Sequence, residues 1–175
     1  TLVARKKKRS TERPLSCTVV VPCHNEEENV EACAARVPQM GKGTEVIFVN
    51  DGSTDGTLEK LSSLESRYPH VKVISYPDNR GKGYAVGRGF QSARGEILMI
   101  LDADLSVSAE DLGEFYFVLA HGKGRFVNGS RLVYPLEHQS MRAFNLWGNQ
   151  FFGMIMSWLL GQRITDTLCG TKALF

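Results

Sequence analysis

The feature that most constrains the fold is a run of five apolar residues, 97–101, that ends at two carboxylates, Asp102 and Asp104. Such a run predicts a strand buried on both faces. Because successive side chains of extended backbone alternate in direction, Asp102 and Asp104 are expected to point the same way at the end of this strand. Two like charges placed that close repel each other unless a cation lies between them. The pattern therefore indicates either a site for a hard divalent cation, completed by the oxygens of a bound diphosphate, or a turn that caps the next helix.

Strand-like and helix-like segments alternate along the chain. Short apolar or β-branched runs predict strands at residues 17–22, 45–50, 71–76, 97–101 and 125–130;. Start and stop signals predict four helices: one that begins at Asn25, one over residues 57–68, one that ends at Ala93, and one that ends at about His121;. The last begins at Ser108, which with Asp111 resembles a capping box;. This alternation indicates an α/β fold with a mainly parallel sheet flanked by helices, in which ligands bind at the carboxyl ends of the strands.

Charge is distributed unevenly along the 175 residues. Six basic residues against Glu12 give +5 in the first thirteen residues, and the net charge of +2 leaves −3 for everything after them. This argues against a body that binds nucleic acid. We expect residues 1–15 to be a basic tail or linker, either solvated or in contact with an anionic membrane, and residues 16–175 to be the folded domain.

Cysteine usage and the chain ends bear on location. The four cysteines have no metal-binding spacing, and the tail lacks the apolar core of a secretory signal;. Both observations predict a cytoplasmic protein. The sequence begins at Thr1 rather than Met and stops at Phe175 within an apolar, strand-like run, so we expect a piece of a longer protein, truncated at its C-terminus.

Residues 141–160 differ from the rest of the chain. Residues 151–160 are apolar on nearly all sides, with Trp147 before them and Arg142 and Arg163 at the flanks. The uninterrupted apolar part is too short to cross a membrane, which takes about 20 residues. The segment predicts either a helix that lies in the membrane interface, or a buried helix or dimer surface.

Six segments together resemble the catalytic domain of the family 2 glycosyltransferases, which has the GT-A fold. Within that family the chain is most similar to the polyprenyl- and dolichyl-phosphate sugar transferases. The segments occur in the family's order at residues 20–27, 45–57, 79–85, 101–106, 129–131 and 166–172. The resemblance implies an inverting, metal-dependent transfer of a sugar from a nucleoside diphosphate to a polyprenyl phosphate, at the cytoplasmic face of a membrane.

The resemblance also implies which residues bind the donor. The base and ribose are assigned to Pro22, Asn25, Glu26 and Asp51. A carboxylate at a strand end suits this role because it accepts hydrogen bonds from ribose hydroxyls or a base N–H. For Asn25 and Asp51, the roles of helix cap and turn residue are compatible with the same positions.

The diphosphate and its metal are assigned to a second group. Lys82, between Gly81 and Gly83, and Lys172 would bring positive charge to the diphosphate, although Thr171 stands where the family usually has an aromatic residue. Asp104, assisted by Asp102, would hold Mg²⁺ or Mn²⁺, which neutralises the charge that grows on the leaving group.

Three further residues are assigned to the acceptor. Asp166 is the candidate catalytic base. A phosphate with a second pKa of about 6 is already ionised at neutral pH, so Asp166 either abstracts a proton or orients the acceptor. Arg131 and Arg142 would bind the lipid phosphate, because a guanidinium matches phosphate oxygens in geometry and charge.

Other functions remain open from the residues. One is a transferase acting on a soluble or polymeric sugar acceptor, and another is a donor-binding module without turnover. A sugar-1-phosphate nucleotidyltransferase is disfavoured, because the first predicted strand is followed by an acidic segment at residues 22–26 rather than a glycine-rich phosphate loop.

Overall fold

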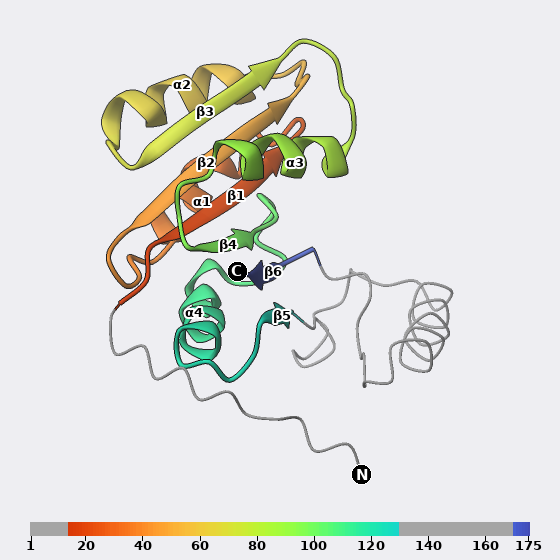
Figure 1. Cartoon of the computed structure of the whole chain (residues 1–175). Helices are drawn as coiled ribbons and strands as arrows, with labels where there is room; N and C mark the ends of the chain where they lie inside the picture. Colours follow the sequence, from red (N-terminus) through yellow and green to blue (C-terminus); the bar gives the residue numbers. More distant parts are fainter. Residues whose placement is uncertain (1–13, 130–169) are drawn as a thin grey trace, which may run out of the picture.

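The computed structural model describes residues 14–129 and 170–175, and within them six strands form one sheet in the order β3-β2-β1-β4-β6-β5 (Figure 1). The strands are β1 (Cys17–Cys23), β2 (Thr44–Asp51), β3 (Val71–Tyr76), β4 (Ile97–Ile100), β5 (Phe126–Asn128) and β6 (Lys172–Leu174). The helices are α1 (Val30–Arg36), α2 (Thr57–Arg67), α3 (Lys82–Ser92) and α4 (Leu112–Ala120), with a 3₁₀ turn η1 (Ala109–Asp111) before α4. The predicted strands are confirmed, although the fifth is shorter than expected.

The sheet is mainly parallel, as predicted. β1 pairs in parallel with both β2 and β4, and β2 pairs in parallel with β3. β6 is the exception, since it runs antiparallel to both β4 and β5 and separates them. Residues 170–175 are thereby brought beside a strand that lies some seventy positions earlier in the sequence.

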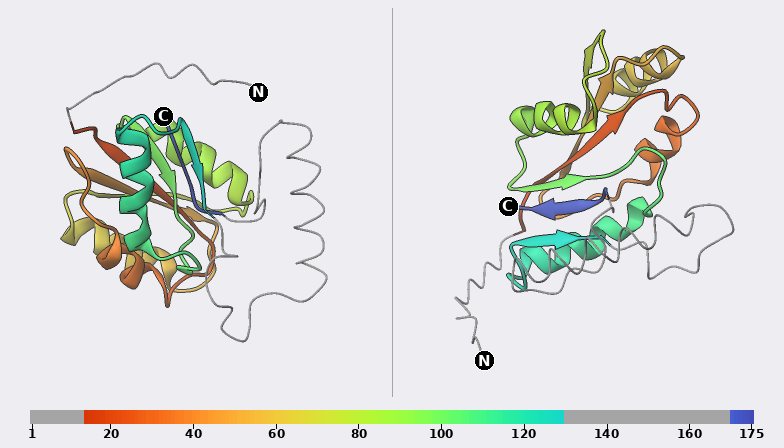
Figure 2. Two further views of the ribbon diagram at one scale, coloured as in Figure 1. Left: turned by 90° about the horizontal axis from the view of Figure 1, so that it is seen from below. Right: turned by 90° about the vertical axis from the view of Figure 1, so that its right-hand side faces the viewer.

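Two apolar layers cover the two faces of the sheet. Alternating residues of β1 point to opposite faces, so that Val19 and Val21 join the large core beneath α1, α2 and α4, whereas Val20 joins a smaller core beneath α3;. Figure 2 shows α3 on the opposite side of the sheet from α1 and α2. A Cβ atom built on Gly89 would lie 2.3 Å from Val20 Cγ1, so this glycine lets α3 pack closely on the sheet.

The predicted start of the first helix is wrong. The helix begins at Val30, and Asn25 has a φ of +56°, outside the helical region. The backbone N–H groups of Asn25 and Glu26 donate to Ser53 Oγ at 3.0 Å and Thr57 Oγ1 at 2.9 Å. These contacts with the loop after β2 and with the first residue of α2 replace the first helical turn;.

The capping box predicted at Ser108 is also wrong in its side-chain contacts. Ser108 precedes η1 but makes no side-chain hydrogen bond to the helix backbone. Its hydroxyl instead contacts the carboxylate of Glu110 and accepts a 3.2 Å hydrogen bond from Arg36 of α1. The Ser108 hydroxyl therefore contacts two side chains, Glu110 and Arg36, instead of a backbone N–H of the helix.

Several predictions concern residues outside the described ranges: the basic residues of the tail, the apolar segment 141–160, and the candidate acceptor residues Arg131, Arg142 and Asp166. Leu15, assigned from sequence to the tail, is buried, and its N–H donates to Tyr116 Oη at 3.0 Å. None of the helices in the described part of the chain has the length and apolar character that a membrane crossing needs.

Candidate active site

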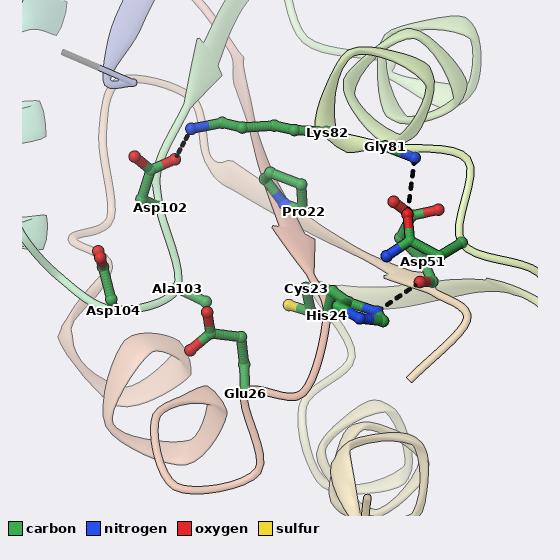
Figure 3. Close-up of a pocket in the computed structure, with 11 residues that line it drawn as sticks. Pro22, Cys23, His24, Glu26, Asp51, Gly81, Lys82, Asp102, Ala103 and Asp104 are labelled. Carbon is green, nitrogen blue, oxygen red and sulfur yellow. Dashed lines mark hydrogen bonds and ion pairs between the residues drawn. The ribbon is translucent and has the colours of Figure 1, made fainter. Parts of the chain in front are cut away.

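A pocket of about 300 Å³ opens at the carboxyl ends of β1, β2 and β4 (Figure 3). Parallel strands end at the same edge of a sheet, so residues far apart in sequence meet there. The candidate residues that line the pocket are Pro22, Glu26, Asp51, Gly81, Lys82, Asp102 and Asp104. The pocket also includes Cys23, His24, Asn79 and Ala103, which sequence reasoning did not single out. All four lie within the family segments named above, and this was the signal available for them.

Asp51 ends β2 and is 3% exposed. Its carboxylate accepts a 2.7 Å hydrogen bond from the Arg80 N–H, and its carbonyl oxygen lies 2.8 Å from Nδ1 of His24. Burial and the neighbouring Asp51 carboxylate raise the pKa of Tyr76. Asp51 is thus fixed between the loop after β1 and the loop before α3.

The glycine after Asp51 makes this arrangement possible. Gly52 has a φ of +63°, and a Cβ atom at that position would lie 2.5 Å from the backbone nitrogen of Asn79. Only a residue without a side chain combines that conformation with so close an approach. The loop after β2 and the loop before α3 therefore form one continuous side of the pocket.

Lys82 and Asp102 face each other across the pocket (Figure 3). Lys82 Nζ lies 2.5 Å from Asp102 Oδ1, and the lysine side chain is 52% exposed whereas the carboxylate is 19% exposed. Lys82 is the first residue of α3 and follows Gly81, whose φ of +87° favours glycine;. The first N–H groups of a helix have no partner within the helix, so an anion in the pocket could accept hydrogen bonds from α3.

The segment before β6 lies against this ion pair. A Cβ atom built on Gly170 would lie 2.1 Å from Asp102 Oδ2 and 2.5 Å from Lys82 Nζ. A side chain at position 170 is therefore incompatible with the pair as it stands. The sequence placed Gly170 within a family segment, but only the insertion of β6 beside β4 brings it onto Asp102.

Asp104 lies on the same side of the pocket as Asp102 (Figure 3). Asp104 Oδ1 accepts a 2.9 Å hydrogen bond from the Ser106 N–H, and the intervening Leu105 has a φ of +53°. Glu26, at the start of the loop before α1, also lines the pocket, and its carboxylate accepts a 2.7 Å hydrogen bond from Asn29. Asp102, Asp104 and Glu26 make this side of the pocket acidic.

These residues fit a hard divalent cation only in part. Among residues 14–129 and 170–175, no group of three or more His, Cys, Asp or Glu side chains is placed to hold a metal ion. Asp102 and Asp104 nevertheless offer the carboxylate oxygens that Mg²⁺ and Mn²⁺ prefer, and a positive charge already lies against Asp102 in the form of Lys82;. The site fits a cation whose remaining ligands come from a bound diphosphate.

Two other candidates lie away from the pocket lining. Asn25 Oδ1 accepts a 2.8 Å hydrogen bond from the Thr54 N–H, so this side chain joins the loops after β1 and β2. Lys172 lies in β6, opposite Ile100 of β4 and Asn128 of β5. Arg131, Arg142 and Asp166 cannot be related to the pocket because they lie outside the described ranges.

Comparison with known proteins agrees with this geometry. Residues 18–175 match the model of the family described as "Glycosyl transferase family 2". The dolichol-phosphate mannosyltransferase of Pyrococcus furiosus is 34% identical over 125 residues, which cover 67% of this chain and 35% of the relative. The dolichyl-phosphate beta-glucosyltransferase of Drosophila melanogaster is 31% identical over 177 residues, covering 90% of this chain and 54% of the relative.

A solved structure supports the same assignment. The mannosyltransferase PcManGT from Pyrobaculum calidifontis, determined in complex with GDP-Man and Mn²⁺, is similar with a TM-score of 0.52 and 29% identity, over 62% of this chain and 33% of that one. The predicted GT-A fold is confirmed. The chain spans about a third to a half of the length of the curated relatives it matches. It belongs to glycosyl transferase family 2.

Proposed function

We propose that this chain is the catalytic part of a transferase that moves a sugar from a nucleoside diphosphate to a polyprenyl phosphate, with inversion at the anomeric carbon and with Mg²⁺ or Mn²⁺ bound. The observation that carries the proposal is the pocket where Lys82 and the start of α3 face Asp102 and Asp104. Cationic groups on one side and carboxylates on the other suit a diphosphate that bridges to a metal. The name and ligands of PcManGT support the donor and metal, and the names of the dolichyl-phosphate relatives support the acceptor.

The donor nucleoside would occupy the part of the pocket next to Pro22, Glu26 and Asp51. Asp51 is held in place by its contacts with Arg80 and His24, so its carboxylate can receive a hydrogen bond from the base or ribose without reorganising;. Glu26 would accept from ribose hydroxyls. Asn25 would support this side of the pocket through its contact with Thr54.

The diphosphate would lie between Lys82 and the two aspartates. Lys82 and the N-terminal turn of α3 would bind its oxygens, and Asp102 and Asp104 would hold the cation;. A bound divalent cation would act as a Lewis acid on the departing nucleoside diphosphate. The protein groups align the donor so that the acceptor oxygen attacks in line with the bond that breaks.

The acceptor side of the proposal rests on the family resemblance. Asp166 would orient the acceptor or take its proton, and Arg131 and Arg142 would bind its phosphate. The apolar segment 141–160 would contact the membrane that carries the lipid acceptor, at its cytoplasmic face. All of these residues lie outside the described ranges.

A panel of UDP- and GDP-sugars, each with Mn²⁺ or Mg²⁺, tests the donor. The correct donor should raise the melting temperature only when the cation is present, because a ligand that binds the folded state stabilises it. Polyprenyl phosphate added to that donor should accelerate nucleotide release and yield a lipid-linked sugar. If a soluble sugar accelerates nucleotide release and polyprenyl phosphate does not, the proposed acceptor class is wrong, and the donor site is unaffected.

A further inference from the structure

The ion pair between Lys82 and Asp102 puts two proposed roles in conflict. Lys82 is expected to bind the donor diphosphate and Asp102 to bind the cation, yet Lys82 Nζ lies 2.5 Å from Asp102 Oδ1. A divalent cation bound to that oxygen would lie close to the ammonium group, and like charges at such distances repel strongly. The pair and the metal complex are therefore mutually exclusive states of one carboxylate oxygen.

A cation could not avoid Lys82 by binding the other carboxylate oxygen of Asp102, Oδ2. Gly170 lies so close that a Cβ atom there would be 2.1 Å from Oδ2 and 2.6 Å from Oδ1. The backbone before β6 thus covers the carboxylate on one side while Lys82 covers Oδ1. Asp102 also has little freedom to turn, since its side chain is only 19% exposed.

Lys82 is free to move where Asp102 is not. It stands at the first position of α3, its side chain is 52% exposed, and its ammonium group is carried on a flexible four-carbon chain;. Movement of this side chain alone would uncover Oδ1. The diphosphate, which carries more negative charge than one carboxylate, is the natural alternative partner within the same pocket.

We infer that Lys82 exchanges between Asp102 and the donor diphosphate, and so couples metal binding to donor binding. This rests on the proposed function. Without donor, the ammonium group holds Asp102 and excludes the cation. When the donor enters, Lys82 pairs with the diphosphate, and Asp102 is released so that it would be able to hold the cation together with Asp104. By thermodynamic linkage, the cation then raises the affinity for the donor by the same factor by which the donor raises the affinity for the cation.

The exchange makes an unusual prediction, namely that removing a proposed donor ligand improves binding of the metal alone. Titration of the full 175-residue chain with Mn²⁺, following free Mn²⁺ by electron paramagnetic resonance, measures this affinity without any activity. Lys82→Met should bind Mn²⁺ about tenfold more tightly than the unchanged protein, within the roughly 5- to 150-fold range typical of coupled sites. Adding UDP or GDP should then tighten Mn²⁺ binding less in Lys82→Met than in the unchanged protein.

Two matched variants control for charge. Lys82→Arg keeps a cation opposite Asp102 and should retain the weak binding of Mn²⁺ alone. Lys42→Met removes one positive charge from the exposed turn before β2, at the opposite end of the strands from the pocket, and should leave Mn²⁺ binding unchanged. If Lys42→Met tightens Mn²⁺ binding as much as Lys82→Met does, the effect comes from net charge and the exchange is wrong.

The outcomes separate this inference from the proposed function. If Mn²⁺ binds the unchanged protein in the presence of UDP or GDP, but Lys82→Met binds Mn²⁺ alone no more tightly, the exchange is wrong and the metal-dependent donor site stands. If Mn²⁺ fails to bind even with both nucleotides tested, the metal site and the exchange are both wrong.

Discussion

A carboxylate oxygen of Asp51 accepts the Arg80 backbone N–H at 2.7 Å, which ties the end of β2 to the loop that leads into α3. The same loop continues through Gly81 to Lys82, so this hydrogen bond helps to join the side of the pocket proposed for the nucleoside to the side proposed for the diphosphate. Asp51 therefore holds this loop in addition to its proposed role toward the ligand.

Substitution of Asp51 should separate these two functions. Asp51→Asn keeps an oxygen that can accept from Arg80 and should leave the free energy of unfolding nearly unchanged, whereas Asp51→Ala removes this part-buried hydrogen bond and should cost about 0.5–1.5 kcal/mol;. Both should weaken nucleotide binding, because both remove the carboxylate. Urea denaturation and calorimetric titration with UDP and GDP measure the two effects. Nucleotide binding that survives in Asp51→Asn would exclude a role for its charge.

Two glycines of α3 provide a matched pair for the packing of this helix on the sheet. A Cβ atom at Gly89 would lie 2.3 Å from Val20, whereas one at Gly87 would meet nothing within 4 Å. Gly89→Ala should therefore destabilise the fold by about 1–3 kcal/mol through overpacking, and Gly87→Ala should stabilise it by up to about 1 kcal/mol through higher helix propensity. Equal effects on the urea midpoint would mean that α3 is not packed as closely as the structure indicates.

The elements that could be predicted from sequence are those whose local pattern and tertiary environment agree. The strands beginning at Cys17, Thr44 and Ile97 are apolar runs that become the buried middle of the sheet, and the strand beginning at Val71 forms its partly buried edge, so periodicity was sufficient;. The loop at Asn25 was mispredicted because its backbone hydrogen bonds go to Ser53 and Thr57, thirty residues away. Hydrogen-bond partners so distant in the sequence leave no local sequence pattern.

The same reasoning explains what could be predicted of the site. Asp51, Asp102 and Asp104 follow parallel strands, and the rule that strand ends meet at one edge was enough to bring them to one pocket;. The contact of Gly170 with Asp102 depends on β6 inserting antiparallel between β4 and β5. No local pattern indicates that insertion, so the contact of Gly170 with Asp102 could not be foreseen.

Acid stability should depend on the ion pair between Arg36 of α1 and Glu110 of η1. Hydrogen bonds from Arg36 and Ser108 lower the pKa of Glu110 to about 2, below its ordinary 4.5. Because the folded-state pKa is the lower one, the stabilisation is fully present above about pH 4.5 and is lost as the pH falls toward 2. Arg36→Met should raise the pKa of Glu110 toward 4.5, as measured by carboxyl NMR titration.

A control for this titration is Arg67→Met, which removes an exposed arginine from α2 and should leave the pKa of Glu110 unchanged. High salt should act in the same direction as Arg36→Met, since the pair is exposed and therefore screened;. A Glu110 pKa that stays near 2 in Arg36→Met would show that Ser108 and the backbone, rather than the arginine, hold the carboxylate ionised.

The proposed acceptor arginines can be tested without structural knowledge of their segment. If Arg131 and Arg142 bind only the acceptor phosphate, Arg131→Ala and Arg142→Ala should raise the KM for polyprenyl phosphate while the dissociation constant of the donor changes little, because a bidentate contact contributes both affinity and alignment. Calorimetry with the donor and transfer kinetics with the lipid measure the two quantities. Equal losses in both would assign these arginines to the donor diphosphate instead.

Asp104 offers the most direct test of metal-dependent donor binding, because its substitution should leave the fold intact. Asp104 is exposed, and Asp104→Asn keeps an oxygen to accept the Ser106 N–H, so the stability without ligands should be preserved. A donor present at 100 times its dissociation constant stabilises the folded state by about 2.7 kcal/mol, and in Asp104→Asn the metal-dependent part of this gain should disappear. Asp78→Asn removes an exposed carboxylate outside the pocket lining and should retain it. Thermal unfolding with donor, with and without Mn²⁺, measures the difference, and full metal-dependent stabilisation of Asp104→Asn would rule out Asp104 as a metal ligand.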